Sequence, residues 1–238
     1  MISRSAVPAA PQLRAIRERW LGQAITGLES EPVIRAAGFV GSLGRGDSDD
    51  WSDVDLLIVV PDEHVDRFAD ASRLPVSGHV MWSIDARHNA PRGAGAVGVR
   101  YLIDGLPLHV DWYVYPRSCA AWVADAKVIF DADGLPRLRD TFSEYQEKRE
   151  TQPPTHKPDN AHRLLQVSLI PVAAKYVVRR STAAGRMVEF VGGPYAPDAA
   201  PTEYVEMLRS LLVTYHDDAP RDLLTSADRY LDIVAAVL

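Results

Sequence analysis

Cysteine is almost absent from this chain of 238 residues, and long hydrophobic runs are absent altogether. The single cysteine, Cys119, excludes an internal disulfide framework and a zinc site built from several cysteines. We expect Cys119 to be a small buried apolar residue in a reducing compartment. The N-terminal stretch MISRSAVPAAPQ holds no apolar core of signal-peptide length, and no later window approaches a membrane span. We therefore expect a cytoplasmic protein with no membrane partner.

Positive charge is also sparse, with 26 Lys and Arg against 32 Asp and Glu. The excess of acids lies in residues 1–150, which carry 22 Asp and Glu and 17 Lys and Arg, whereas residues 151–238 carry 10 and 9. The sequence has no basic block and no basic stripe with interleaved aromatic residues. This composition argues against a nucleic-acid partner and favours a small-molecule substrate.

The first 150 residues mix helical and strand patterns. They predict a helix over 11–28, a surface helix over 62–73 and a charged helix over 135–149. Short apolar runs predict strands over 33–40, 53–60, 79–85, 98–103, 108–115 and 127–130. Asp104-Gly105 between two of these runs predicts an antiparallel hairpin. We expect the loop 86–96, rich in alanine and glycine, to be exposed and mobile.

A proline-rich stretch, TQPPTHKPDN at Thr151–Asn160, predicts a domain boundary. Beyond it only helical periodicity occurs, over 161–180 with Pro171 inside, 183–191, 202–215 and 221–238. We therefore predict two domains. Residues 1–150 form an α/β (α+β) domain with a small mixed sheet, and residues 151–238 form an all-α helical bundle.

The stretch GFVGSLGRGDSDDWSDVDLLIVV, residues 38–60, joins two predicted strands through a polar loop. Gly41 permits close approach of the backbone to a ligand, and Ser42 offers a hydroxyl and an amide to an anion. Asp53 and Asp55 are two apart on a strand, so their carboxylates share one face. Two adjacent carboxylates with phosphate oxygens nearby suit Mg²⁺.

Asp111 is the only acid in the apolar and aromatic strand predicted over 108–115, and a buried lone carboxylate is costly unless it is paired or bound to a metal. We predict it as the third acid of the site. Pairing of Asp111 with Arg100 on the neighbouring strand is the alternative. We assign no catalytic role to His79, His88 or His109.

The loop acids Asp47, Asp49 and Asp50 have a simpler interpretation. We expect their side chains to be solvated.

Gly41-Ser42, then ten intervening residues, then Asp53-Val54-Asp55 and a later strand aspartate, resembles the signature of the nucleotidyltransferase superfamily. The resemblance covers roughly residues 33–115 and is greatest to the antibiotic nucleotidyltransferases of the aminoglycoside and lincosamide type. It implies that Asp53, Asp55 and Asp111 bind one or two Mg²⁺ and that Gly41 and Ser42 contact the triphosphate.

The same resemblance implies a reaction. A hydroxyl of a small acceptor, an antibiotic being one candidate, attacks the α-phosphate of ATP or another nucleoside triphosphate, and pyrophosphate leaves. Asp111 would help to take the hydroxyl proton. Lys175, then Arg179 and Arg180, and Arg45 from the loop are the candidate cations for the triphosphate.

Two other functions fit the same residues. One is a nucleotide-binding regulator without catalysis, against which the intact set of three acids speaks. The other is an enzyme that modifies a protein, like the antitoxins of this fold, although those usually lack a large second domain.

Overall fold

The computed structural model describes residues 9–150, 152 and 159–238. Contacts divide the chain into two units. The sheet unit comprises Arg14–Tyr101 and Leu108–His156, and the helical unit comprises Lys157–Leu238 with Met1–Leu13 and Leu102–Pro107. Most of the predicted linker Thr151–Asn160 lies outside the described residues, and the domain boundary after residue 150 stays a prediction.

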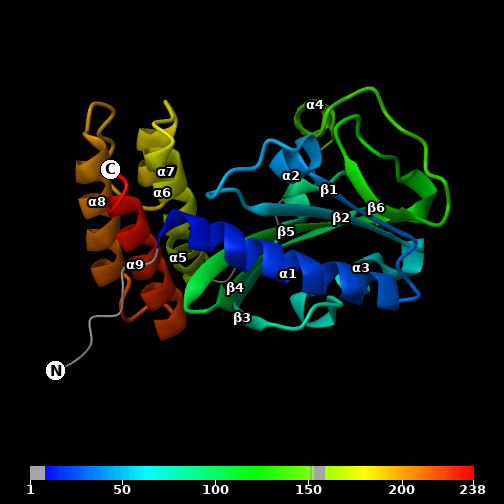
Figure 1. The fold of residues 1–238 in the computed structure, drawn as a ribbon, viewed down its shortest axis with the longest axis horizontal. Helices are drawn as coiled ribbons and strands as arrows, with labels where there is room; N and C mark the ends of the chain where they lie inside the picture. The colour runs from blue at the N-terminus through cyan, green and yellow to red at the C-terminus, as the bar shows by residue number, and fades with distance from the viewer. Residues whose placement is uncertain (1–8, 151, 153–158) are drawn as a thin grey trace. The chain divides into compact units, whose positions relative to one another are not determined.

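Six strands form one mixed sheet in the order β3-β4-β5-β2-β1-β6 (Figure 1). β1 is antiparallel to β2 and to β6, whereas β2 is parallel to β5. Asp104 and Gly105 have φ angles of 53° and 76° between β4 and β5, which are neighbours in the sheet. A two-residue turn with positive φ can join only antiparallel strands, so the predicted hairpin is confirmed. The strands are β1 (Ala36–Val40), β2 (Val54–Val60), β3 (His79–Asp85), β4 (Gly95–Ile103), β5 (Leu106–Pro116) and β6 (Lys127–Asp131).

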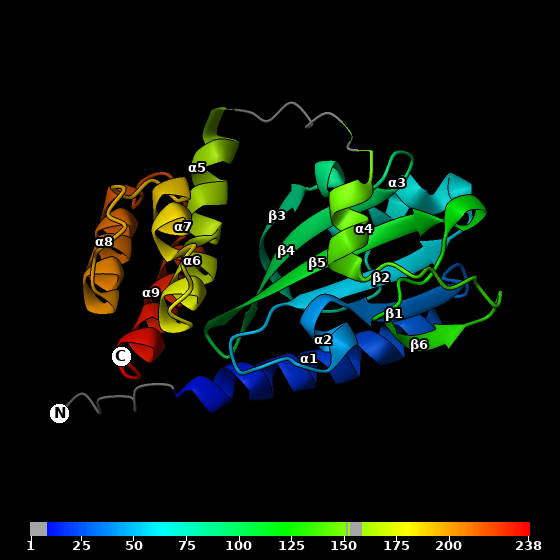
Figure 2. The same ribbon diagram turned by 90° about the horizontal axis from the view of Figure 1, so that it is seen from above.

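Helices cover both faces of this sheet (Figure 2). On one face α1 (Ala10–Ser30) packs through Trp20, whose ring centroid lies 5.9 Å from that of Trp112. On the other face Phe142 of α4 (Phe142–Lys148) packs edge to face on Tyr113, with ring centroids 5.1 Å apart. The short α2 (Gly41–Arg45) and α3 (Val65–Phe68) follow β1 and β2. Both faces are therefore buried along most of their length.

Two local predictions in the sheet unit are wrong in detail. The surface helix over 62–73 is broken into α3 and two 3-10 turns, because the Asp70 side chain accepts a hydrogen bond from the Ser72 amide and starts a new turn. The charged helix over 135–149 begins only at Phe142, where Thr141 and Glu144 form a capping box.

The prediction of an exposed loop over 86–96 holds for Arg92 and Gly93 but is wrong for its alanines. Its alanines are buried against the core that includes Tyr113 and Tyr115, and Ala90 is fully buried. The side-chain amide of Gln152 donates hydrogen bonds to the carbonyls of Pro91 and Ala94 at 2.7 and 2.9 Å. The alanine side chains are small and backbone carbonyls of this segment accept hydrogen bonds, so the alanines can pack against the sheet.

Cys119 is exposed in a 3-10 turn after β5, contrary to the expected buried position. The turn follows Pro116 directly, at the place where the strand leaves the sheet. Little apolar surface therefore surrounds the Cys119 thiol.

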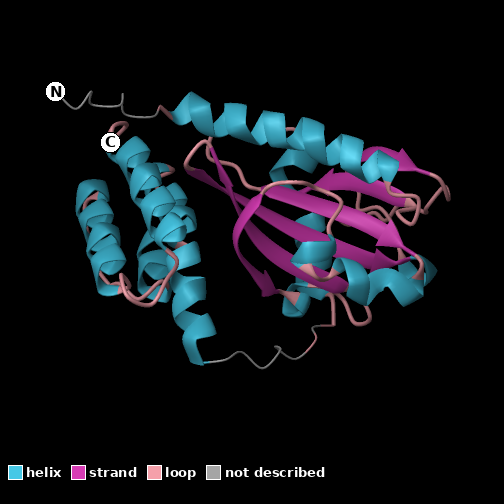
Figure 3. Cartoon of the chain, turned by 90° about the horizontal axis from the view of Figure 1, so that it is seen from below, coloured by secondary structure: helices cyan, strands magenta, loops and turns pink. Residues whose placement is uncertain are grey.

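The described part of residues 159–238 consists of helices and loops (Figure 3). Pro171, at the start of α6, splits the helix predicted over 161–180 into two. No helix among the described residues is long and apolar enough to cross a membrane. The predicted fold class, an α/β domain with a mixed sheet followed by helices, is confirmed. The helices are α5 (Asp159–Ser168), α6 (Ile170–Val178), α7 (Ala184–Phe190), α8 (Pro201–Thr214) and α9 (Arg221–Ala235).

Candidate active site

The three predicted acids meet on one face of the sheet, at the start of β2 and in the middle of β5. In the parallel pairing of these strands Asp55 is opposite Asp111, and Val54 is opposite Val110. Asp53 immediately precedes β2 and, two residues from Asp55, points to the same face. Adjacent strands lie about 4.8 Å apart, so the sheet itself brings the carboxylates together.

His109 lies between two of these acids. Its Nε2 donates to Asp111 Oδ1 at 2.9 Å, and its Nδ1 lies 3.8 Å from Asp53 Oδ2. The imidazole side chain is only 13% exposed, whereas those of Asp53 and Asp111 are 26% and 32% exposed. The contact with Asp111 orients that carboxylate. Sequence reasoning gave His109 no role, although its spacing of two from Asp111 on a strand placed both on one face.

Gly41 directly follows β1, begins α2 and lies beside Asp55. Its φ of +60° belongs to the left-handed region, and a Cβ at this position would lie 2.3 Å from Asp55 Oδ2. The Ser42 carbonyl accepts hydrogen bonds from the amides of Gly46 and Asp47 at 3.0 and 3.1 Å, which closes the turn. Only glycine permits both this backbone conformation and the close approach of the carboxylate.

The loop that leads to Asp53 is anchored to α1. The buried Arg17 donates from Nη1 to the carbonyls of Asp49 and Ser52 at 2.7 and 2.9 Å. The Asp50 carboxylate forms an ion pair with Arg14 at 2.7 Å and is 24% exposed. Asp49 and Asp50 are therefore held in a structured loop, and the expectation that they are solvated is wrong for both. It holds for Asp47, whose side chain is 59% exposed.

The candidate cations lie in two places. Arg45, at the end of α2 in the sheet unit, forms an ion pair with Asp47 at 3.0 Å and lies 3.9 Å from Asp125. Lys175 is buried in α6, and Arg179 caps the C-terminus of that helix. Lys175 and Arg179 belong to the helical unit, and their role toward the triphosphate stays a prediction.

Arg100 on β4 is a further charged residue of the acid face. It is 3% exposed, and burial lowers the pKa of its guanidinium to about 10 while Asp111 and Asp53 raise it. Arg100 therefore remains charged at neutral pH. The alternative pairing of Asp111 with Arg100 thus has support in their electrostatic interaction, alongside the contact of Asp111 with His109.

The donor set fits a magnesium ion held by few protein ligands. Among the residues that the structure describes, no three or more His, Cys, Asp or Glu side chains are gathered as a ready metal site. Mg²⁺ usually binds one or two carboxylates and completes its octahedron with waters and substrate phosphates. Asp53 and Asp55 supply such a pair, and the space that Gly41 leaves open is filled by the Asp55 carboxylate.

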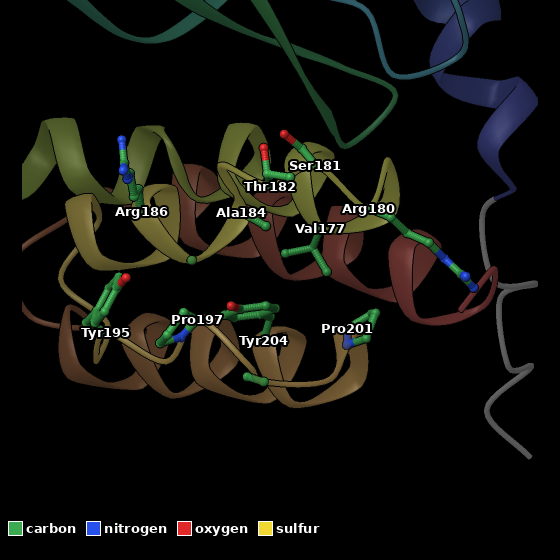
Figure 4. A pocket seen from close by; sticks show the side chains of 12 residues that line it. Val177, Arg180, Ser181, Thr182, Ala184, Arg186, Tyr195, Pro197, Pro201 and Tyr204 are labelled. Atoms are coloured by element: carbon green, nitrogen blue, oxygen red, sulfur yellow. The ribbon is translucent and has the colours of Figure 1, made fainter.

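The helical unit contains a pocket of about 300 Å³ between α7, α8 and the segment that joins them. Figure 4 shows Tyr195, Pro197 and Tyr204 along one side of it, with Arg180 and Arg186 extending away from Tyr204 in different directions. The Tyr204 hydroxyl donates to the Ala196 carbonyl. The lining of the pocket combines two tyrosines and two arginines with mostly small side chains.

One family model matches part of the sheet unit. Residues 22–90 match the model of the nucleotidyltransferase domain family, a segment that includes Gly41, Ser42, Asp53 and Asp55 but ends before Asp111. These residues therefore match a nucleotidyltransferase domain, which supports a nucleotidyltransferase enzyme. The narrower resemblance to the antibiotic-modifying group stays a prediction.

One solved structure similar to this chain is a STING-associated CdnE c-di-GMP synthase from Capnocytophaga granulosa. The two share 11% sequence identity and superpose with a TM-score of 0.31, over 95% of this chain and 81% of the other. At this score the two folds are only loosely alike. No curated protein matches the chain.

Proposed function

We propose that the protein is a Mg²⁺-dependent enzyme that transfers a nucleoside monophosphate, AMP from ATP in the first instance, to a hydroxyl of a small molecule. The observation that carries this proposal is the register that sets Asp55 opposite Asp111 on one face, with Asp53 beside them. Antibiotics are one class of candidate acceptor. The choice of ATP and of an antibiotic rests on the sequence resemblance.

The proposed reaction is the one that the sequence resemblance implies. The acceptor oxygen forms a bond to the α-phosphorus, the bond from that phosphorus to the bridging oxygen breaks, and its electron pair leaves with pyrophosphate. Asp111 would accept the hydroxyl proton, and the 2.9 Å contact with His109, which orients its carboxylate, supports this role. Asp53 and Asp55 would hold the cation, which when bound would neutralise charge on the phosphates.

The turn at Gly41 and Ser42 supports the proposed binding of the triphosphate. The backbone there approaches Asp55 closely, because Gly41 has no side chain to separate them. A phosphate bound at this turn would therefore lie next to the proposed cation. Arg45 lies at the far end of the same short helix. Of the basic residues in the sheet unit, it is the nearest in sequence to Gly41 and Ser42.

Replacement of one carboxylate by its amide tests the proposal. Asp53→Asn should lower pyrophosphate release from nucleoside triphosphate plus acceptor about a thousandfold, the equivalent of several kcal/mol of lost stabilisation, with thermal unfolding unchanged. Asp66→Asn, which alters an acid on α3 whose side chain is 83% exposed, is the matched control and should keep the wild-type rate.

The assay should screen each nucleoside triphosphate against aminoglycosides, lincosamides and biosynthetic nucleosides. Retention of the rate in Asp53→Asn would contradict the proposal. ATP binding without turnover by the wild type would favour a regulator, and a modified protein found by mass spectrometry among copurified partners would favour a protein-modifying enzyme.

A further inference from the structure

Arg100 lies on the acid face of the sheet, next to Asp111. Its neighbour Tyr101 points to the opposite face, where its ring lies 5.3 Å from that of Trp20. Alternation along β4 therefore places Arg100 and Gly98 on the same face as the acids. A Cβ on Gly98 would lie 3.1 Å from Asp111 Oδ1 and 3.8 Å from Arg100 Nη1, so the guanidinium and the carboxylate both lie beside this glycine.

A buried guanidinium is costly unless opposite charges and hydrogen-bond acceptors surround it. Arg100 is almost fully buried, and its Nη1 also donates to the Val99 carbonyl at 3.4 Å. The planar guanidinium offers five donors in fixed directions, so it can serve several acceptors at once. Asp111 and Asp53 interact with its charge, and they stabilise it in this position.

We propose that Arg100 is a positioning residue that acts as a built-in counter-cation for Asp111 and Asp53, so that the acid face takes up one divalent cation, at Asp53 and Asp55. The inference rests on the proposed function, because it concerns the same three acids. Three carboxylates and one guanidinium leave two negative charges, which one divalent cation balances. Arg100 would hold Asp111 in place whether or not the cation is bound.

Metal binding to the full chain without nucleotide tests this inference. Mn²⁺ titration followed by electron paramagnetic resonance should find one site per chain in the wild type. Arg100→Met removes the positive charge with little change in volume, and it should bind Mn²⁺ about tenfold more tightly or gain a second site, because an uncompensated carboxylate attracts cations. Arg100→Lys should keep one site with near wild-type affinity.

The direction of the change in Mn²⁺ affinity distinguishes a role of Arg100 through its charge from a role through packing alone. If Arg100 only filled space, Arg100→Met would disturb the acids and weaken Mn²⁺ binding, and equal or weaker binding would overturn the inference. Arg35→Met is the matched control, since Arg35 pairs with Asp133 just before β1, at the end of that strand away from Gly41, and should leave Mn²⁺ affinity unchanged.

A variant that does not fold also gives a result. If Arg100→Met unfolds because Asp111 has lost its counter-charge, Arg100→Met with Asp111→Asn should recover the wild-type thermal midpoint, and failure to recover it would overturn the inference. Absence of Mn²⁺ binding in the wild type would instead count against the proposed metal site. The recovery of stability in the double variant would still report on Arg100.

Discussion

The two faces of the central sheet both carry packed apolar side chains, but only one of them also carries a group of charged residues. Trp112 on β5 is fully buried and packs on Trp20 of α1, and Val110 and Val114 beside it are also fully buried. Asp111, one residue away, has a side chain that is 32% exposed and contacts His109. The first face contains only packing, whereas the second contains the candidate chemistry.

The difference between the two faces explains how the three acids keep their positions although their carboxylates form no bonds to one another. A slip of β2 by one residue against β5 would turn Val54 and Leu56 toward the acid face, at the cost of their buried surface. The apolar face therefore selects the register, and the register places Asp55 opposite Asp111. Substitutions on one face and the other should have separable effects.

The largest expected effect on stability is that of Trp112→Ala. It removes the largest buried side chain of this face on β5, so we expect a loss of about 4 kcal/mol in the free energy of unfolding, measured by urea denaturation. Trp112→Phe keeps most of the packing and should lose about half as much. A stability near that of the wild type in Trp112→Ala would contradict the division of roles between the faces.

Gly41→Ala should have a smaller effect on stability and a large one on activity. A left-handed backbone at alanine costs about 1–2 kcal/mol, and the new Cβ must also displace the Asp55 carboxylate. We expect pyrophosphate release to fall about a hundredfold, as for a carboxylate moved from its ligand position.

Gly46→Ala is the control for Gly41→Ala. Gly46 also has a positive φ, of 79°, but a Cβ there meets nothing within 4 Å. Gly46→Ala should lose about as much stability as Gly41→Ala but keep the wild-type rate of pyrophosphate release. Equal rates for the two variants would show that the contact with Asp55 has no consequence.

Much of the sheet unit was predictable from local patterns. The Gly-Ser turn, the apolar strands and the Asp104-Gly105 hairpin are all encoded within a few residues. The spacing of Asp53 and Asp55 placed them on one face, and alternation in β5 singled out Asp111. These features needed no knowledge of distant contacts.

The remaining features depend on partners far apart in the sequence. The parallel register of β2 and β5 joins segments more than fifty residues apart, and no local pattern specifies it. The contact of His109 with Asp111 has a local signal, but the place of Arg100 near Asp111 depends on how β4 pairs with β5. The burial of the alanines in residues 86–96 depends on Gln152 and on the tyrosines of β5, which composition alone does not reveal.

The smallest expected effect lies just before β1, at the end of the strand away from Gly41. Hydrogen bonds from Arg35, at 2.7 Å for the shortest, together with the charges of Arg117 and Arg35, lower the pKa of Asp133 below its ordinary value of 3.8. A carboxyl with a lowered pKa in the folded state adds stability above pH 3.8, and this contribution is lost as the pH falls through the folded pKa.

Asp133→Asn should therefore flatten the fall in stability as the pH drops from about 5 toward 3, measured by urea denaturation at each pH. Arg35→Met should flatten it in part, because it removes the main cause of the shift, and the double variant should match Asp133→Asn. Pyrophosphate release at pH 7 should be unchanged in all three, since the pair lies at the opposite end of β1 from Gly41. An acid slope equal to that of the wild type in Asp133→Asn would contradict the assignment, and a lower rate would mean that the two ends of β1 are coupled.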